Sequence, residues 1–131
     1  MNMIEIMIET ELKEELVDIT LLIENAVKKL GVIDGNAVIF CPHTTAGLTI
    51  NENADPDVKA DILTALSSLE FEKLPFKHFE GNSPAHVKAG LMGHSLNIMI
   101  QNGKLMLGRW QGIFFCEFDG PRTRKVFLNI L

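Results

Sequence analysis

Two stretches of the chain repeat apolar residues with the spacing of an α-helix. The first runs from Thr20, a possible N-cap, to the stop signal Gly31. Its apolar face comprises Leu22, Ile23, Ala26, Val27 and Leu30. The second begins at Asp55, which can cap a helix, with Pro56 at the first helical position. Its apolar face comprises Val58, Ile62, Leu63, Leu66 and Leu69.

Short apolar runs separated by turn residues predict strands over most of the remaining chain. A long loop over 70–83 and a short helix from Pro84 to about Met92 interrupt them. Strands are predicted at Met3–Ile8, Asn36–Cys41, Gly47–Glu52, Ser95–Gln101, Lys104–Leu107, Gln111–Phe118 and Thr123–Leu131. Asn102-Gly103 favours a tight hairpin with a type I′ turn, so the strands cannot all be parallel. We therefore expect an α+β fold with antiparallel, sandwich-like β-sheets and two to three flanking helices.

Composition narrows the class of protein. The chain has 131 residues, of which 47% are hydrophobic and 22% charged, and this predicts one compact domain over residues 1–131. No apolar run approaches the roughly 20 residues of a membrane span, and the acidic start does not resemble a signal peptide. The net charge of −5 disfavours non-specific binding of nucleic acid. We expect a cytoplasmic protein that binds neither membranes nor nucleic acids.

Charge is distributed unevenly along the chain. Residues 1–86 hold fifteen acidic and six basic residues, whereas residues 87–131 hold two acidic and six basic residues. Arg109, Arg122 and Arg124 lie in this basic part. Two interpretations are open: these cations belong to a solvated face, or some of them meet an anionic ligand such as a phosphate.

Histidines are the main candidates for chemistry near neutral pH, because the chain has no tyrosine and only two cysteines. His43 follows a predicted buried strand, and His78 and His86 flank a loop that can fold back. Together they could form a three-histidine metal site with an open position, suited to zinc or another transition metal. The alternative is that they are turn, surface or capping histidines. His94 is interpreted as a turn residue.

Three further segments contain candidate site residues. Glu52 and Asn53 have no evident role in starting the helix that follows them, so they are candidates for binding a metal or orienting its ligands. Trp110 and Gln111 lie between glycines and could stack on a ring or recognise an amide, although a lone tryptophan is usually part of a core. Glu117 lies in an apolar strand and needs a partner, for which Arg122, Arg109 or a ligand is available.

Six motifs in order give the chain a resemblance to a known family. They are His43-Thr44-Thr45-Ala46, Asn51-Glu52-Asn53-Ala54-Asp55-Pro56, His78 with Glu80-Gly81-Asn82, Pro84-Ala85-His86-Val87-Lys88, Gly108-Arg109-Trp110-Gln111-Gly112 and Glu117-Phe118-Asp119-Gly120-Pro121-Arg122. This series resembles the YjbQ-like family, often labelled secondary thiamine-phosphate synthases. The resemblance implies a compact antiparallel β fold with flanking helices, a homotrimer, and a histidine cluster formed by His43, His78 and His86.

The activity implied by the resemblance joins a pyrimidine pyrophosphate to a thiazole phosphate and releases pyrophosphate. We expect a divalent metal ion on His43, His78 and His86, with magnesium as an alternative that accompanies the pyrophosphate. Catalytic roles are assigned to Glu52, Glu117 and Arg122. Substrate-binding roles are assigned to Thr44, Thr45, Asn53, Trp110, Gln111 and Arg124. The alternatives are a metal-dependent hydrolase of a phosphorylated metabolite and a trimeric metal- or metabolite-binding protein without activity.

Overall fold

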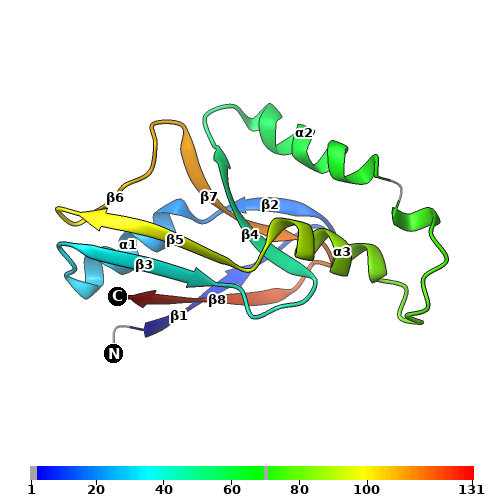
Figure 1. The fold of residues 1–131 in the computed structure, drawn as a ribbon, viewed down its shortest axis with the longest axis horizontal. Coiled ribbons are helices and arrows are strands. Elements are labelled where there is room, and N and C mark those ends of the chain that lie inside the picture. Colours follow the sequence, from blue (N-terminus) through cyan, green and yellow to red (C-terminus); the bar gives the residue numbers. More distant parts are fainter. Residues whose placement is uncertain (1–2, 70) are drawn as a thin grey trace.

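Eight strands form two antiparallel sheets in the computed structural model, which describes residues 3–69 and 71–131 (Figure 1). The larger sheet has the strand order β1-β8-β3-β5-β6, and the smaller one the order β2-β7-β4. The strands are β1 (Met3–Glu9), β2 (Glu15–Asp18), β3 (Gly35–Phe40), β4 (Ala46–Glu52), β5 (Ser95–Gln101), β6 (Lys104–Leu105), β7 (Gln111–Glu117) and β8 (Thr123–Ile130). The predicted α+β class with antiparallel sheets is confirmed.

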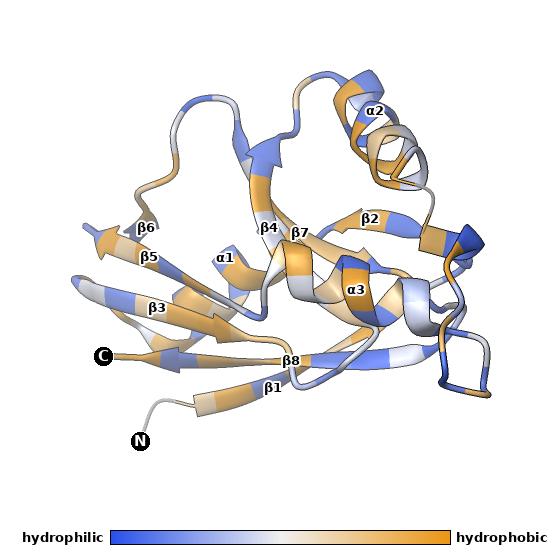
Figure 2. Ribbon diagram, turned by 45° about the vertical axis from the view of Figure 1, so that its right-hand side comes forward, coloured by the Kyte–Doolittle hydropathy of each residue, from blue (hydrophilic) through white to orange (hydrophobic). Residues whose placement is uncertain are grey.

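Three α-helices and one short 3₁₀ helix complete the fold. They are α1 (Thr20–Leu30), α2 (Pro56–Ser67), α3 (Ser83–Met92) and η1 (Phe71–Lys73). The start of α2 follows the predicted signal, because the Asp55 carboxylate accepts a hydrogen bond from the Asp57 backbone N–H at 2.9 Å. Figure 2 shows that α2 carries both hydrophobic and hydrophilic residues, as expected of a helix that packs on one side.

Strand β7 separates two apolar cores, which explains why its sequence is apolar at nearly every position. Ile113 and Phe115 face a core that both sheets share with α1. Phe114 and Cys116, on the opposite face, pack in a second core with residues of α2 and α3. Because successive side chains of a strand alternate between its faces, coverage on both sides buries every residue of β7 except Gln111.

Several sequence predictions were wrong in detail. β2 and η1 were not predicted, and the strand expected over Lys104–Leu107 is only the two residues of β6. Thr20 does not cap α1 but is its first residue, and its hydroxyl accepts the Ile113 N–H at 2.9 Å. Leu69 lies beyond the end of α2 and is exposed. No helix among the described residues is long and apolar enough to span a membrane.

Candidate functional site

A cavity of about 440 Å³ opens at one end of the sandwich, where two loops meet. The loops are 41–45, which joins β3 to β4, and 118–122, which joins β7 to β8. They are held together by the Phe118 N–H, which donates to the Thr45 carbonyl at 3.2 Å. The cavity is lined by Pro42, His43, Thr44, Thr45, His78, Glu80, Asn82, His86, Asp119, Arg122 and Arg124. It therefore contains the three predicted metal-binding histidines and two of the arginines.

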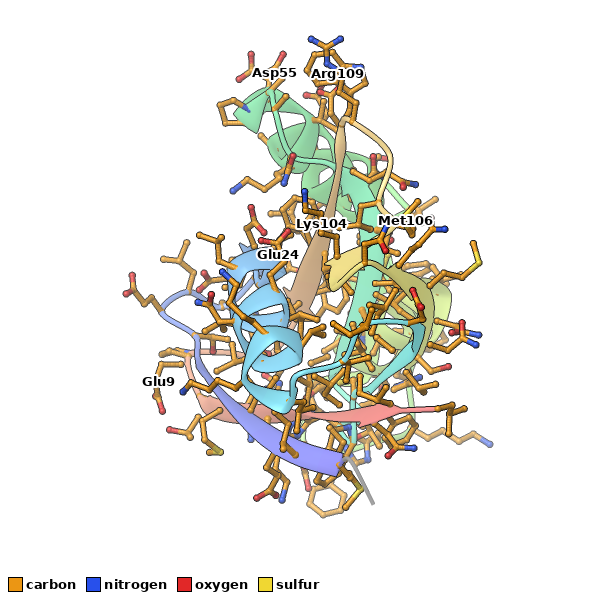
Figure 3. The ribbon with its side chains drawn as sticks, turned by 90° about the vertical axis from the view of Figure 1, so that its left-hand side faces the viewer. Glu9, Glu24, Asp55, Lys104, Met106 and Arg109 are labelled. Atoms are coloured by element: carbon orange, nitrogen blue, oxygen red, sulfur yellow. The ribbon has the colours of Figure 1, made fainter. Side chains whose placement is uncertain are left out.

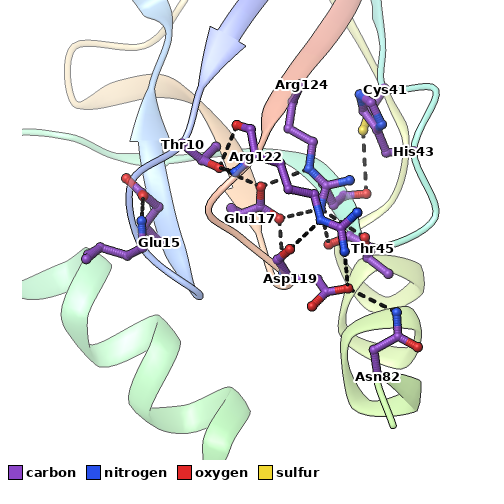
Figure 4. Close-up of polar contacts among 12 residues, drawn as sticks. Thr10, Glu15, Cys41, His43, Thr45, Asn82, Glu117, Asp119, Arg122 and Arg124 are labelled. Carbon is purple, nitrogen blue, oxygen red and sulfur yellow. Dashed lines mark hydrogen bonds and ion pairs between the residues drawn. The ribbon is translucent and has the colours of Figure 1, made fainter. Parts of the chain in front are cut away.

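A buried ion pair forms the floor of this region (Figure 4). Glu117 of β7 and Arg124 of β8 both point into the space between the sheets, where Glu117 is fully buried and only 5% of the Arg124 side chain is exposed. The guanidinium binds both carboxylate oxygens, with Nε at 2.8 Å from Oε1 and Nη2 bonded to Oε2. Thr10 Oγ1 and the Asp119 backbone N–H also donate to this carboxylate, at 2.8 and 3.0 Å. Its acceptor capacity is therefore filled.

The charge of Glu117 is maintained by these donors. Burial alone raises the pKa of this carboxyl, but hydrogen bonds from Arg124, the Asp119 N–H and Thr10 outweigh burial and lower the pKa below its usual value. Arg124 is held in turn by Thr45, whose Oγ1 accepts from Nη2 at 2.9 Å. Its Nη1 has no hydrogen-bond partner among the described residues, and Arg124 lines the cavity.

His43 occupies the place where β3 stops pairing with β8. The last pair is Phe40 with Phe127, and beyond it the His43 Nε2 lies 3.0 Å from the Lys125 backbone N and 3.1 Å from its O. The ring packs edge-on against Phe115, with 6.3 Å between centroids. Burial and the nearby Arg124 lower the pKa of His43, which favours the neutral imidazole. If Nε2 donates to the Lys125 carbonyl, the lone pair on Nδ1 is available to a ligand.

His78 and His86 form the closest histidine pair in the cavity. Their ring centroids lie 5.5 Å apart, with His78 in the loop before α3 and His86 in the first turn of that helix. Two imidazole rings at this separation suit a transition-metal ion. Within residues 3–69 and 71–131, however, no group of three or more His, Cys, Asp or Glu side chains is close enough to hold a metal as arranged. The histidine side chains are suitable metal ligands. As arranged, however, His43 does not form a three-histidine set with His78 and His86.

The remaining wall of the cavity is a polar network on the 118–122 loop. Arg122 binds Asp119 through Nε to the carbonyl at 2.6 Å and through Nη2 to the carboxylate at 2.9 Å. Asn82, directly before α3, donates to the same carboxylate at 3.0 Å, while its own Oδ1 is buried without a partner. The N-terminus of α3 thus lies beside the cavity, a position that favours anions. Sequence reasoning assigned no site role to Asp119, Asn82 or Glu80, although all three fall in recognised motifs.

Four of the predicted site residues lie elsewhere: Glu52, Asn53, Trp110 and Gln111. Glu52 pairs with Gln111 at the end of the β4–β7 ladder opposite to the Ala46–Glu117 pair. At roughly 3.3 Å per residue, a seven-residue strand separates the two ends by about 20 Å. Figure 3 shows Arg109 at the extremity of the molecule, near Asp55. One subunit therefore does not bring these four residues to the cavity.

Comparison with known proteins places these observations in a family. The family model described as UPF0047 protein YjbQ-like matches residues 4–131. UPF0047 protein MJ1081 of Methanocaldococcus jannaschii is 56% identical over 124 residues, covering 95% of this chain and 90% of its own length. UPF0047 protein YugU of Bacillus subtilis is 48% identical over 125 residues, covering 95% of each chain.

Solved structures resemble this one over nearly the whole chain. The crystal structure of an uncharacterised YjbQ/UPF0047 protein from Clostridium acetobutylicum has a TM-score of 0.94 at 58% identity and covers 98% of this chain and 99% of its own. The hypothetical protein APE1520 from Aeropyrum pernix also has a TM-score of 0.94, at 35% identity, and covers 100% of this chain and 98% of its own. The names of these proteins state no activity.

Proposed function

The chain belongs to the YjbQ-like UPF0047 family, and on this premise we propose that it is a transferase that acts on phosphorylated substrates in the histidine-lined cavity. The proposed reaction joins a pyrimidine pyrophosphate to a thiazole phosphate and releases pyrophosphate. One observation carries the proposal: a single cavity gathers three histidines, two arginines and the N-terminus of α3. These are groups that bind phosphate oxygens or the metal that accompanies them.

The charge balance of the cavity supports a role for a divalent metal. Arg122 is paired with Asp119 and Arg124 with Glu117, so neither guanidinium brings uncompensated positive charge. His43, His78 and His86 would hold zinc or another transition metal, which would supply positive charge for a diphosphate. Magnesium bound to the pyrophosphate is the alternative. In the first case the neutral state of His43 is the form that binds the metal.

The protein's own groups would serve mainly to stabilise the leaving group. In the reaction the carbon–oxygen bond to pyrophosphate breaks, a bond forms between the thiazole nitrogen and the pyrimidine methylene, and no net proton transfer is needed. Arg122 is half exposed, so its guanidinium can turn from Asp119 to the departing phosphate oxygens. Arg124 Nη1 would bind other oxygens, and the positive end of the α3 dipole would favour their negative charge. Glu117 acts by holding Arg124 rather than by touching substrate.

The test is an assay of purified protein with both substrates and either Zn²⁺ or Mg²⁺, measuring the formation of thiamine phosphate. We expect the double variant His78→Ala/His86→Ala to lose at least about a hundredfold in rate, the scale of losing a metal or its ligands. His94→Ala is the matched control, because His94 is the one histidine that does not line the cavity. Turnover of the double variant at the wild-type rate would contradict the proposal.

A second candidate is a metal-dependent hydrolase of a phosphorylated metabolite. It is favoured by the three histidines around an open cavity, because a metal held there would activate water as the nucleophile. A panel of phosphate and pyrophosphate esters, assayed without the thiazole phosphate, separates the two reactions. Tight metal binding without turnover in either assay would indicate a binding protein.

A further inference from the structure

We infer that the cavity is shared between subunits: the exposed turn carrying Arg109 and Trp110 of one copy enters the cavity of a second copy and completes it. This inference rests on the proposed function for the identity of the ligand, which is an anionic, phosphorylated molecule. It adds that Trp110 supplies a stacking surface and Arg109 a positive charge from the partner subunit. The turn cannot reach the cavity of its own subunit, because about 20 Å of β-ladder separates them.

The turn that carries Arg109 and Trp110 is held by three hydrogen bonds. The Gly108 N–H donates to Gln111 Oε1 at 2.7 Å, and the Gln111 N–H donates to the Gly108 carbonyl at 3.0 Å. The Asn53 N–H holds the Trp110 carbonyl at 3.0 Å. Nevertheless 54% of Trp110 is exposed, with the Arg109 guanidinium 4.8 Å above its ring. An aromatic side chain fixed at its backbone and left open to solvent is typical of a binding anchor.

Charge complementarity points to the cavity as the place where this anchor binds. Both arginines of the cavity are neutralised by carboxylates, and Glu80 adds a further negative charge to the lining. Arg109 has no carboxylate partner in the described part of the chain and contacts only the Trp110 ring. An unpaired guanidinium from the partner subunit would therefore give the cavity the excess positive charge that a phosphorylated ligand requires.

The outer face of the larger sheet carries exposed apolar residues at both ends, with polar side chains such as Asn97 between them. Phe40 lies three residues before His43, and Met106, next to Met99, lies three residues before Arg109. Asn129, on the same face, has a buried Oδ1 without a partner. A second copy covering this face would approach the cavity with one end and offer its turn with the other. Such a head-to-tail contact repeats around a ring and closes into a cyclic oligomer such as a trimer.

Cysteine cross-linking tests the contact without requiring activity. The double variants Thr44→Cys/Arg109→Cys and Glu80→Cys/Arg109→Cys place thiols on the cavity rim and on the turn, at exposed positions. The native Cys41 and Cys116 are buried and do not compete. After mild oxidation we expect covalent dimers and trimers on a non-reducing gel. Lys29→Cys/Arg109→Cys is the matched control, with an exposed thiol at the end of α1, and should yield at most a tenth of the product.

The outcomes separate this inference from the proposed function. Cross-linked oligomers with both cavity pairs support the shared cavity even if no thiamine phosphate is formed. A protein that elutes as a monomer, or as an oligomer in which neither cavity pair cross-links above the control, overturns it even if the enzyme is active. Circular dichroism and elution volume show whether each variant has kept its fold. Because Thr44 and Glu80 lie on different loops, the inference is overturned only if neither cavity pair cross-links above the control.

Discussion

Two arginine–carboxylate pairs lie within eight residues of each other, and they differ in burial and in the number of hydrogen bonds that hold them. Glu117–Arg124 spans two strands between the sheets and is almost wholly buried, whereas Asp119–Arg122 lies in the turn that joins those strands, with 52% of the Arg122 side chain exposed. The buried pair is fixed by additional donors and acceptors. The exposed pair can exchange its partner for a ligand at little cost, because water replaces the contacts. The Glu117–Arg124 pair therefore serves as part of the framework, whereas the Arg122 guanidinium is free to exchange Asp119 for a ligand.

The largest expected effect comes from breaking the buried pair. Glu117→Gln leaves the Arg124 guanidinium buried without a counter-charge, and we expect it to lower the free energy of unfolding by about 3–5 kcal/mol. Urea denaturation measures the loss. The double variant Glu117→Leu/Arg124→Leu removes both charges and should cost less than Glu117→Gln. If the double variant is the less stable of the two, the buried pair is not the source of the effect.

Acid should reveal the same pair in the wild-type protein. The folded-state pKa of Glu117 is lowered, so its contribution to stability is complete above the unfolded-state pKa of about 4.3 and is lost as pH falls through the folded value. We expect the unfolding free energy to drop steeply below about pH 4.3 and to be nearly independent of Glu117 between pH 5 and 7. Urea titrations at pH 3, 4, 5 and 7 check this. The double leucine variant should show a shallower loss in acid.

Lys88 provides an intermediate case between the two arginine pairs. Its side chain is only 2% exposed, yet its ammonium reaches Glu14 at 2.9 Å and Glu72 at 3.1 Å, both of which have access to water. Lys88→Met removes the buried charge itself and leaves carboxylates that solvent can hydrate. We expect a loss of about 1 kcal/mol in unfolding free energy, well below that of Glu117→Gln. A loss equal to that of Glu117→Gln would show that the two ion pairs of Lys88 stabilise the fold as strongly as the buried arginine pair.

The elements that were predicted correctly carry local signals. The start of α2 follows from Asp55-Pro56, and the hairpin after β5 follows from Asn102-Gly103, both of which adopt positive φ. β2 was missed because four residues, two of them acidic, contain too little periodicity to distinguish a strand from a loop. The apolar sequence of β7 predicted a strand, but only the packing of α2 and α3 shows that it is covered on both faces.

The predicted site residues lie together where loops converge and are separated where strand register decides. His43, His78 and His86 were grouped by residue type, and the structure places them around one cavity. Glu52 and Trp110 were grouped with them by motif, yet the β4–β7 register places these two at the opposite end of the ladder. The partner of Glu117 was sought among Arg122, Arg109 and a ligand. It is Arg124, because alternation along β8 turns Arg124 inward beside Val126 and Leu128, a consequence of register that the turn sequence does not contain.

The smallest effect on stability, and the clearest on binding, is expected at Arg122. Arg122→Gln breaks only an exposed pair, so the unfolding free energy should change by no more than about 1 kcal/mol. Binding of inorganic pyrophosphate, measured by calorimetry with Zn²⁺ present, should weaken by about tenfold or more, because a charge-assisted hydrogen bond is lost. Arg122→Lys keeps the charge but loses the bidentate geometry of the guanidinium. Its affinity for pyrophosphate should lie between those of the wild-type protein and Arg122→Gln. Unchanged affinity in Arg122→Gln would place this arginine with the buried pair, as part of the framework, and would leave Arg124 as the guanidinium that meets the ligand.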